Sequence, residues 1–501
     1  MTAYLSIGAN RIQTWLLRTP ELALIRGASR ALAEVTSRTE IEAILTSDQG
    51  LFDGVTSIAA TPGGDGETGD VDGVVPLKLP STEVARTIAY GVLTRLGKQL
   101  PGVEWEAWWC EANSYVAALH RNTQGQVEGR LMWVPTIQDC GLVEACEQCR
   151  REPARAVTLT AEGRSDPGRD CAARMARSGQ GKDWDRGARP QLEDIRGQWA
   201  QDFDTLARRG GLRKGGKKPL ALGRKESRNH LATIVADGNS LGALFGLISN
   251  PPGGIDTSAL AQSTSIAIDA ACAGAVVAAA NMVTDPEPEI AAVEPHFLGG
   301  DDIFASVPAG AAWRFAATLS ASFAHMVSGL KAWIPSGAST QDGLRELANY
   351  KSDLEAAIDG ISLGIGICFA HVSHPVYETH AEAERAMVAA KRKGKGSASW
   401  IGWVDLTADT SAPPFTVSAK QVIAELDGTE PANCLPDVFA LSASARAQLG
   451  SILRDSDPGE AVIQSWASRV GWERPGQRTP LVEMPAALSR ARWFPGVKED
   501  E

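Results

Sequence analysis

The segment at residues 297–307 constrains the fold of this chain more than any other. It reads Phe-Leu-Gly-Gly-Asp-Asp-Ile-Phe-Ala-Ser-Val, so two glycines and two adjacent aspartates separate two short apolar runs. This pattern predicts a β-hairpin with acidic side chains at its tip. Gly299 and Gly300 can adopt positive φ and leave room for a bulky anion beside the backbone. Asp301 and Asp302 are oxygen ligands of the kind that bind Mg²⁺ or Mn²⁺.

A second acidic residue follows an apolar run earlier in the chain. Residues 231–242 read Leu-Ala-Thr-Ile-Val-Ala-Asp-Gly-Asn-Ser-Leu-Gly, which predicts a buried strand that ends at Asp237 and a polar turn. A helical segment near 263–283 and another apolar run then lead to the Gly-Gly-Asp-Asp turn. This order would place Asp237 and Asp301 at one end of a sheet. Together they could bind two metal ions and a triphosphate, whereas either motif alone also suits an ordinary solvated turn.

These motifs resemble the polymerase/cyclase palm of the CRISPR polymerase family, the large subunit of type III CRISPR effector complexes. A third element is similar too: a buried strand at 361–371, an amphipathic helix at 381–391, a Gly-Lys-Gly-Ser turn at 394–397 and an apolar stretch at 398–404. The resemblance is most specific over residues 229–405. It implies an α+β fold with two ferredoxin-like, nucleotide-cyclase-like palm domains, a cysteine-rich zinc-binding insert and a C-terminal helical domain.

The resemblance also implies a chemistry. Palms of this family join two ATP molecules with loss of pyrophosphate, and repetition and closure give cyclic oligoadenylates. Asp237, Asp301 and Asp302 would be the catalytic residues and the ligands of two Mg²⁺ or Mn²⁺ ions, with Asp302 either a ligand or a group that polarises the attacking hydroxyl. The implied nucleotide-binding residues are Gly238, Asn239, Ser240, Gly299, Gly300 and Lys391. Lys391 would meet the triphosphate as a mobile charge; the alternative is a solvated lysine on a helix face.

The sequence contains no P-loop and no His-Glu-x-x-His motif. This fits nucleotidyl transfer, which needs positioning and charge neutralisation more than a protein nucleophile. The seven histidines are scattered and form no His-Asp dipeptide, so we expect the chain to lack the His-Asp nuclease domain that many family members carry. We therefore expect no DNase activity. Manganese-dependent cleavage of single-stranded DNA that is lost on mutation of a histidine would contradict this expectation.

Composition indicates a globular protein of several domains, with 44% apolar and 22% charged residues in a chain of 501. The net charge of −11 argues against a general nucleic-acid coat protein, because phosphate binding needs concentrated positive charge. The N-terminus shows no signal-peptide pattern. The apolar segment 266–283 carries Asp269 and Asn281, which favours a buried core helix over a membrane span. We expect a cytoplasmic protein without a membrane partner.

The eight cysteines fall into two groups. Four lie in apolar surroundings and are predicted to be reduced core residues: Cys110, Cys272, Cys368 and Cys434. The other four are close in sequence: Cys140, Cys146, Cys149 and Cys171. Cys146-Glu-Gln-Cys149 has the spacing with which two thiolates share a tetrahedral zinc. The family often has two such knuckles, but here the second keeps only Cys171, so Cys140 would be the fourth ligand of a structural zinc; a degenerate, metal-free knuckle is the alternative.

The N-terminal region resembles the first, degenerate palm of the family. A strand at 3–10 is followed by helical patterns, and either Ile7 or Gly8 stands where the second palm has Asp237. This palm should therefore bind no catalytic metal. We expect residues 61–73, which are rich in Gly, Asp and Glu, to form a mobile surface loop. The basic stretch at 208–228 would contact RNA phosphates or ATP, or serve as a flexible linker.

Four units follow from these patterns. They are a degenerate palm-like domain at 1–134, a zinc-binding insert and basic linker at 135–228, a catalytic palm at 229–406, and a C-terminal helical domain at 415–501. Three functions stay open. The first is cyclic oligoadenylate synthesis from ATP, activated by target RNA in a complex with other type III subunits and guide RNA. The others are a stand-alone cyclase with another cyclic nucleotide product, and a non-catalytic scaffold subunit of a CRISPR complex.

Overall fold

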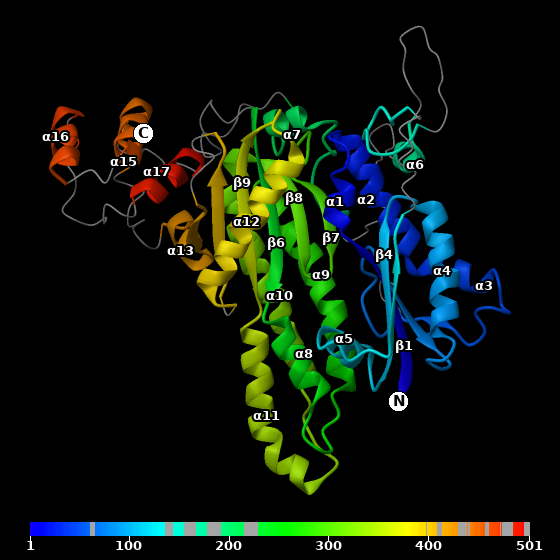
Figure 1. Cartoon of the computed structure of the whole chain (residues 1–501). Helices are drawn as coiled ribbons and strands as arrows, with labels where there is room; N and C mark the ends of the chain where they lie inside the picture. Colours follow the sequence, from blue (N-terminus) through cyan, green and yellow to red (C-terminus); the bar gives the residue numbers. More distant parts are fainter. Residues whose placement is uncertain are drawn as a thin grey trace.

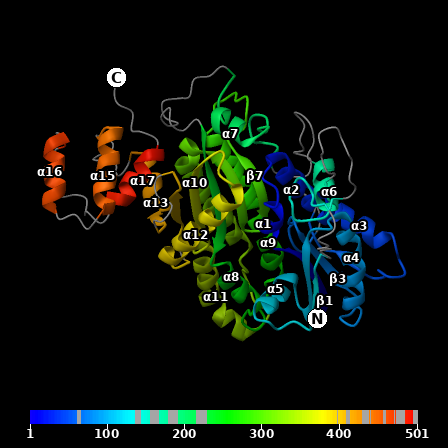
Figure 2. The ribbon, with the colours of Figure 1, turned by 45° about the horizontal axis from the view of Figure 1, so that its top comes forward.

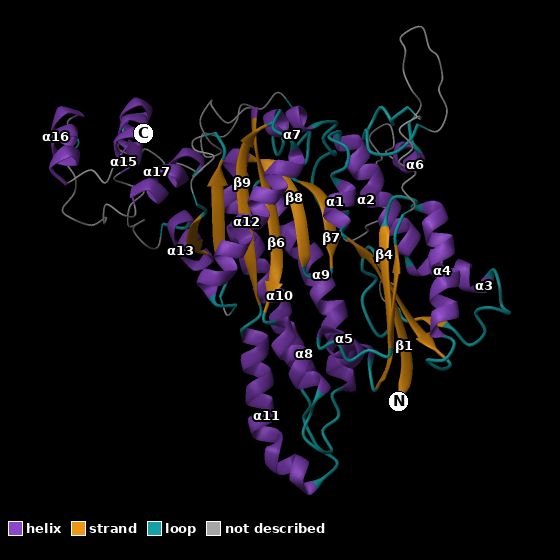
Figure 3. Cartoon of the chain, viewed as in Figure 1, coloured by secondary structure: helices purple, strands orange, loops and turns teal. Residues whose placement is uncertain are grey.

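A computed structural model shows an α+β protein with two β-sheets, as predicted (Figures 1 and 3). The structure describes residues 1–60, 66–135, 144–154, 167–177, 192–214, 229–396, 398–407, 413–428, 438, 441–455, 460–470, 472 and 484–494. Cys140, Cys434 and most of the basic stretch lie outside the described residues. Every structural statement below concerns the described part of the chain.

The first sheet is built from the N-terminal third of the chain. Its strands are β1 (Thr2–Asn10), β2 (Thr56–Ser57), β3 (Val74–Leu79), β4 (Glu104–Ala112) and β5 (Gly129–Trp133). They lie in the order β2-β3-β1-β4-β5, and all neighbours are antiparallel. The helices of this region are α1 (Ile12–Leu16), α2 (Leu22–Thr36), α3 (Arg38–Thr46), α4 (Ala85–Gln99) and α5 (Tyr115–Thr123).

The second sheet is larger. Its strands are β6 (His230–Asn239), β7 (Glu294–Gly299), β8 (Asp302–Pro308), β9 (Ser362–His371), β10 (Trp400–Asp405) and β11 (Phe415–Ser418). They lie in the order β11-β10-β9-β6-β8-β7, and only β9 and β10 are parallel. The helices are α8 (Leu241–Ser249), α9 (Ser258–Met282), α10 (Ala312–Val327), α11 (Gln341–Asp359) and α12 (Val376–Gly394), with short 3₁₀ turns at Ala309–Ala311 and Ser328–Trp333.

The two sheets share one topology. In chain order within each sheet, the second, third, first and fourth strands lie side by side, as β2-β3-β1-β4 and as β7-β8-β6-β9. The first strand is therefore central in both, which is the ferredoxin-like arrangement expected of a palm. The N-terminal region, predicted to resemble a degenerate palm, thus repeats the strand order of the second palm.

Side chains of β6 alternate between two buried faces of the second sheet. Ala232, Ile234 and Ala236 face the core formed with α9 and α10. On the opposite face Val235 joins an apolar cluster with the first palm, and Thr233 hydrogen-bonds to Thr379 of α12 at 2.8 Å. Asp237 continues this second series. Near the end of β6, Asp237 thus points its acidic side chain toward α12, where it pairs with Lys391.

Glycines on β9 and β10 allow α12 to lie close against the sheet (Figures 1 and 2). Gly366 and Gly402 are register partners on the two strands. A Cβ on Gly366 would lie 2.6 Å from the backbone nitrogen of Met387 and closer still to the carbonyl of Ala383. These glycines therefore set the height of α12 above the sheet.

We expect Gly366→Ala to lower the free energy of unfolding by about 2–3 kcal/mol, because α12 must move away from β9 to admit the methyl group. Urea denaturation followed by circular dichroism would measure the change. Gly329→Ala is the matched control, since a Cβ there meets no atom within 4 Å. Equal stability of the two variants would contradict the close packing of α12 described above.

The two palms share a continuous interface. Residues of the second sheet, among them Val235, Phe297 and Phe304, belong to the same apolar cluster as the core of the first palm. Beside it, Arg26 of α2 forms a two-pronged ion pair with Glu294 at the start of β7, and both side chains are buried. Since a buried charge without a partner is costly, this pair specifies how α2 sits on β7.

The insert between the palms contributes two short described helices, α6 (Arg169–Arg177) and α7 (Phe203–Arg209). Helix α6 packs against α2, and its buried residues Asp170 and Arg174 bind to α1. The carboxylate of Asp170 accepts a hydrogen bond from Trp15 Nε1 at 3.1 Å and binds Arg174 at 2.9 Å. The Arg174 guanidinium also donates to the carbonyls of Trp15 and Leu16 and lies 4.4 Å above the Trp15 ring. Helix α6 is thus anchored to the first palm.

The C-terminal region is helical beyond its first residues, with α13 (Ala419–Leu426), α15 (Ala443–Asp455), α16 (Glu460–Val470) and α17 (Met484–Trp493). Helices α15 and α16 lie at the end of the molecule away from the first sheet (Figure 2). Residues 415–418, predicted to open the helical domain, instead form β11 and pair with β10. Helix α17 returns to the palm, where Trp493 Nε1 donates to buried Asp405 at 2.8 Å.

Two further expectations concern segments near the palm interface. Helix α9 is long and apolar enough to cross a membrane by length and composition, but half of its apolar window is buried, and it packs on α10 as the predicted core helix. The expectation of a mobile loop at 61–73 is wrong for residues 66–73. Thr68 is buried, and the carbonyl of Gly66 accepts a hydrogen bond from Gln262 of α9 at 2.6 Å. Residues 61–65 lie outside the described part.

Candidate functional site

The end of β6 meets the β7–β8 turn, as the sequence predicted. Asp301 in the turn packs directly against Gly238, which follows Asp237: a Cβ on Gly238 would lie 2.6 Å from Asp301 Oδ2 and 2.9 Å from Asp301 Cβ. The register pairs Ala236 with Ile303, so Asp237 and Asp302 stand opposite each other one residue further along. Three carboxylates separated by up to 65 positions in the chain thus converge.

The β7–β8 turn requires two glycines for different reasons: Gly300 for its positive φ and Gly299 for the space that a Cβ would fill. Gly299 pairs with Asp302, which leaves Gly300 and Asp301 as the two turn residues. Gly300 has φ of 61°, where glycine is favoured. Gly299 has no positive φ, contrary to the expectation for both glycines. A Cβ on Gly299 would instead lie 2.5 Å from the ring of Phe297.

Burial and the charges of neighbouring carboxylates raise the pKa values of Asp301 and Asp302. The pKa of Asp301 is raised to about 6. Burial is the main cause, and the charge of Asp237 and a hydrogen bond with Asp237 add to it. Burial, followed by the charges of Asp301 and Asp237, raises the pKa of Asp302 to about 7. Clustered carboxylates of this kind repel one another unless a cation lies among them. The donor set of three aspartates therefore fits one or two divalent cations such as Mg²⁺ or Mn²⁺.

The raised pKa values predict a pH-dependent effect of neutralising Asp302. A carboxyl group whose pKa is raised in the folded state stabilises the fold below about pH 4 and loses that contribution as pH rises to about 7. In metal-free buffer, Asp302→Asn should therefore leave stability nearly unchanged at pH 4.5 and increase it at pH 8, by on the order of 2 kcal/mol. Thermal unfolding of both proteins at the two pH values measures this. A gain of equal size at both would contradict the shift.

Lys391 near the end of α12 reaches the same point. Its Nζ forms an ion pair with Asp237 and donates to the carbonyl of Gly238 at 3.1 Å. The aliphatic part of the side chain crosses Gly364, the register partner of Asp237 on β9. A Cβ on Gly364 would lie 3.0 Å from Lys391 Cε and closer to its Cγ. The solvated-lysine alternative does not hold for Lys391.

The turn after β6 is closed by its own side chains. Ser240 has φ of 65°, and its hydroxyl donates to the carbonyl of Gly396 rather than capping α8. Asn239 is buried, and its side chain donates to Ser362 Oγ at 3.1 Å. The structure therefore gives the predicted nucleotide-binding residue Asn239 a bracing contact with β9. The backbone of this turn lies next to Asp237 and Lys391, and the carbonyl of Gly238 accepts a hydrogen bond from Lys391.

Sequence reasoning missed three neighbours of the site. Gly364 carries no functional atom, so only the register of β9 identifies it. Glu384 lies two helical turns before Lys391 on α12 and contributes to the raised pKa of Asp302. Cys272 of α9 is a buried thiol whose pKa is raised well above its usual value by burial and by the charges of the aspartates, Asp301 foremost. A search for residues spaced seven apart on the helix of Lys391 could have found Glu384.

At the corresponding point in the first palm, Gly8 and Val74 stand in place of Asp237 and Asp302. Arg11 and Ser240 are both left-handed residues that precede the first helix of their palm, so Gly8 stands where the second palm has Asp237. The register agrees: Gly8 pairs with Val74, the first residue of β3, as Asp237 faces Asp302, the first residue of β8. Of the two residues predicted for this position, the structure selects Gly8.

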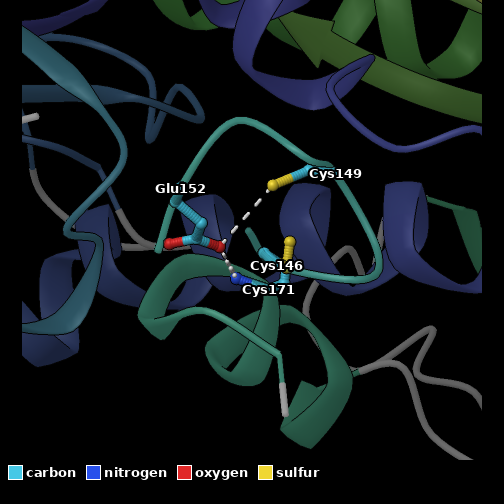
Figure 4. Close-up of side chains that lie close together, drawn as sticks. All are labelled: Cys146, Cys149, Glu152 and Cys171. Atoms are coloured by element: carbon cyan, nitrogen blue, oxygen red, sulfur yellow. Dashed lines mark hydrogen bonds between the residues drawn. The ribbon is translucent and has the colours of Figure 1, made fainter. Parts of the chain in front are cut away.

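A second group of ligating side chains lies in the insert (Figure 4). Cys146, Cys149 and Cys171 are buried next to one another, and their ligand atoms and one oxygen of Glu152 all lie within 4.8 Å of each other. A hydrogen bond from Cys171 lowers the pKa of the Cys149 thiol to about 6, which favours a thiolate near neutral pH. Three thiols and a carboxylate are a donor set that fits zinc. Cys140, the predicted fourth ligand, lies outside the described residues.

A comparison with family models identifies the second palm. Residues 230–399 match the model described as Cas10/Cmr2, second palm domain. The second palm of this chain is therefore similar to that of Cas10/Cmr2 proteins. The match covers β6 through the end of α12, and so includes every aspartate of the site and Lys391. A comparison with curated proteins gave no match.

Solved structures of Cas10 proteins have a similar fold. The crystal structure of Csm1 from T. onnurineus is similar with a TM-score of 0.50 and 11% identity, over 98% of this chain and 69% of that one. A Csm1–Csm4 cassette in complex with cA4 has a TM-score of 0.47 and 13% identity, over 98% and 70%. A cassette in complex with one ATP has a TM-score of 0.43 and 15% identity, over the same shares. At 11% identity the likeness to the T. onnurineus structure concerns the fold alone.

Proposed function

We propose that this chain is a metal-dependent nucleotidyltransferase of the Cas10 family that converts ATP into cyclic oligoadenylates. The observation that carries the proposal is the convergence of Asp237, Asp301 and Asp302 at the end of a palm sheet, with Lys391 paired to Asp237. A carboxylate cluster and a mobile lysine form a complementary pair of subsites. The carboxylates suit divalent cations, and the lysine suits a triphosphate.

The roles of the residues follow from where they lie. Asp237 and Asp301 would hold the metal ions, which neutralise the triphosphate and activate the attacking 3′-hydroxyl. Asp302, whose pKa is raised to about 7, is suited to accept a hydrogen bond or the proton from that hydroxyl. When nucleotide binds, the Lys391 ammonium would exchange Asp237 for a phosphate oxygen, since both lie within reach of its flexible side chain. Gly300 leaves the approach to the backbone unobstructed by side chains, whereas Gly238 is covered by the side chain of Asp301.

The first palm completes the site without a metal of its own. With Gly8 in place of an aspartate, it would contribute a surface that holds one nucleotide against the second palm. The buried Arg26–Glu294 pair and the shared apolar cluster keep the two palms in a defined relation. We further propose that the protein works in the cytoplasm with other type III CRISPR subunits, guide RNA and target RNA, and that target RNA activates synthesis.

The test is product analysis. Purified protein is incubated with ATP, and separately with GTP, in Mg²⁺ or Mn²⁺, and products are identified by mass spectrometry beside the double variant Asp301→Ala/Asp302→Ala. We expect cyclic oligoadenylates that disappear in the variant. A guanylate product would assign the same site to a different cyclase reaction. If the isolated chain is silent, the assay is repeated with partner subunits and target RNA; silence there too would contradict the proposal and favour a scaffold.

A further inference from the structure

The cysteine group of the insert has a fourth member that the sequence did not suggest (Figure 4). Glu152 lies three residues after Cys149, and one of its carboxylate oxygens belongs to the group of ligand atoms formed with Cys146, Cys149 and Cys171. We propose that Glu152, and not Cys140, is the fourth protein ligand of a structural zinc ion. The site would then be of the Cys₃Glu type. This inference does not depend on the nucleotidyltransferase activity.

The separations suit tetrahedral coordination. Zinc–sulfur and zinc–oxygen bonds of ordinary length place two tetrahedral ligand atoms about 3.6 to 3.8 Å apart. Cys149 Sγ lies 3.8 Å from Glu152 Oε1. The group as a whole spans no more than 4.8 Å between any two of its ligand atoms, so small side-chain rotations are sufficient to bring all four to one ion.

Backbone hydrogen bonds aim the Glu152 carboxylate at the thiols. Oε1 accepts from the backbone nitrogen of Cys171 at 2.9 Å, and Oε2 accepts from that of Asp170 at 3.0 Å. Each bond occupies one lone pair of its oxygen, and the second lone pair of Oε1, which accepts from the Cys149 thiol, becomes available to a metal when that thiol is deprotonated. Such bonds to a ligating carboxylate fix its orientation, as is common around metal sites. They also satisfy backbone donors at the start of α6.

Gly168 provides the space for this arrangement. A Cβ on Gly168 would lie 2.6 Å from Glu152 Oε1 and closer still to its Cδ. A side chain at 168 would therefore push the carboxylate away from α6 and from Cys171. The knuckle is closed on its other side by a hydrogen bond from Cys146 N to the carbonyl of Glu152 at 2.7 Å. Both the backbone and the side chain of Glu152 thus belong to the same compact loop.

A zinc ion at this site would fasten the insert to the first palm. Cys171 belongs to α6, whose next residue toward the N-terminus, Asp170, binds Trp15 and Arg174 in the buried contact with the first palm. The metal would join the knuckle at 146–152 to this anchored helix. Its role would be structural, because all four positions of a tetrahedral ion are taken by protein ligands.

The first measurement is zinc K-edge X-ray absorption on the full-length protein, together with metal content by mass spectrometry. We expect one zinc with three sulfur ligands and one oxygen ligand. The Co²⁺-substituted protein should give charge-transfer absorption for three thiolates. Four sulfur ligands, or less than stoichiometric binding, would overturn the proposal. Neither readout requires ATP turnover or any mutated residue, so the result does not depend on whether a variant folds.

Variants then test whether the fourth zinc ligand is Glu152, a water molecule or Cys140. Glu152→Gln keeps a hydrogen-bond acceptor for α6 but loses the charged ligand, and should weaken zinc binding at least about tenfold in chelator competition. Gly168→Ala should weaken it too, although every ligand atom is retained. Cys140→Ser and the exposed control Glu144→Gln should bind as the unmodified chain does. Unchanged affinity in Glu152→Gln, which a water ligand predicts, or a loss in Cys140→Ser would overturn the assignment.

Discussion

Replacing Asp237 by asparagine is expected to lower the rate of oligoadenylate synthesis by on the order of 10³-fold. Asp237 is the carboxylate that the other site residues surround: it hydrogen-bonds Asp301, faces Asp302 across the sheet and pairs with Lys391. In the proposed mechanism its loss would remove a metal ligand and leave the triphosphate charge uncompensated, a kind of electrostatic defect that typically costs two to three orders of magnitude. Initial rates with ATP and Mn²⁺, under whichever conditions support turnover, measure the effect.

The matched control for this variant is Asp353→Asn. Asp353 is exposed on α11, outside the site, so the same chemical change there should leave the rate within about twofold. The melting temperature of Asp237→Asn in metal-free buffer should be no lower than that of the unmodified protein, because one of three clustered carboxylates has been neutralised. Near-normal synthesis by a folded Asp237→Asn would refute the assignment of the site.

A methyl group on Gly364 should reduce synthesis by about 10²-fold although it removes no functional group. Gly364 lies beneath the aliphatic part of Lys391, and a Cβ there would displace that side chain from Asp237. Lysine is flexible, so the protein should fold with Lys391 moved rather than unfold. Displacement of a positioned group by about 1 Å is known to cost about this much rate. Gly364→Ala moves the Lys391 ammonium, whereas Lys391→Met removes it. The comparison therefore shows whether synthesis depends on the position of this charge or only on its presence.

The expected pattern for these variants is specific. Lys391→Met should lose at least as much rate as Gly364→Ala, and the double variant little more than Lys391→Met, because both changes act on one side chain. Gly337→Ala is the control, since a Cβ there meets no atom within 4 Å. Independent, multiplying effects of the two single changes would show that Gly364 acts through the fold and not through Lys391.

Much of the palm could be predicted because its signals are local. The apolar run of β6, the Gly-Gly-Asp-Asp turn and the long helix α9 each depend on a pattern within some 25 residues, and the structure has all three. The order of these elements then predicted that Asp237 and Asp301 would meet. The resemblance to a family added the roles of the residues and the element that contains helix α12. This helix begins five residues earlier than predicted.

Errors occurred where a residue's environment is made by distant segments. Residues 66–73 are polar and rich in glycine, so their sequence indicates a loop in solvent, yet α9 of the second palm supplies a partner for Gly66. Residues 415–418 have too few positions to show a strand period and pair only because the edge of β10 is available. Asn239 was predicted to lie in a turn, but it is the last residue of β6 and donates a hydrogen bond to Ser362, 123 residues away.

The sequence by itself determined which chemical groups are present and which helices, strands and turns of the second palm form, because propensity, periodicity and turn residues act over a few neighbouring positions. Only the tertiary structure decided which groups act together. The choice of Gly8 over Ile7, the passage of Lys391 across Gly364 and the approach of Glu152 to Cys171 depend on strand register and on helices packed from far along the chain. Register and packing are properties of pairs of segments, and neither segment of a pair specifies them alone.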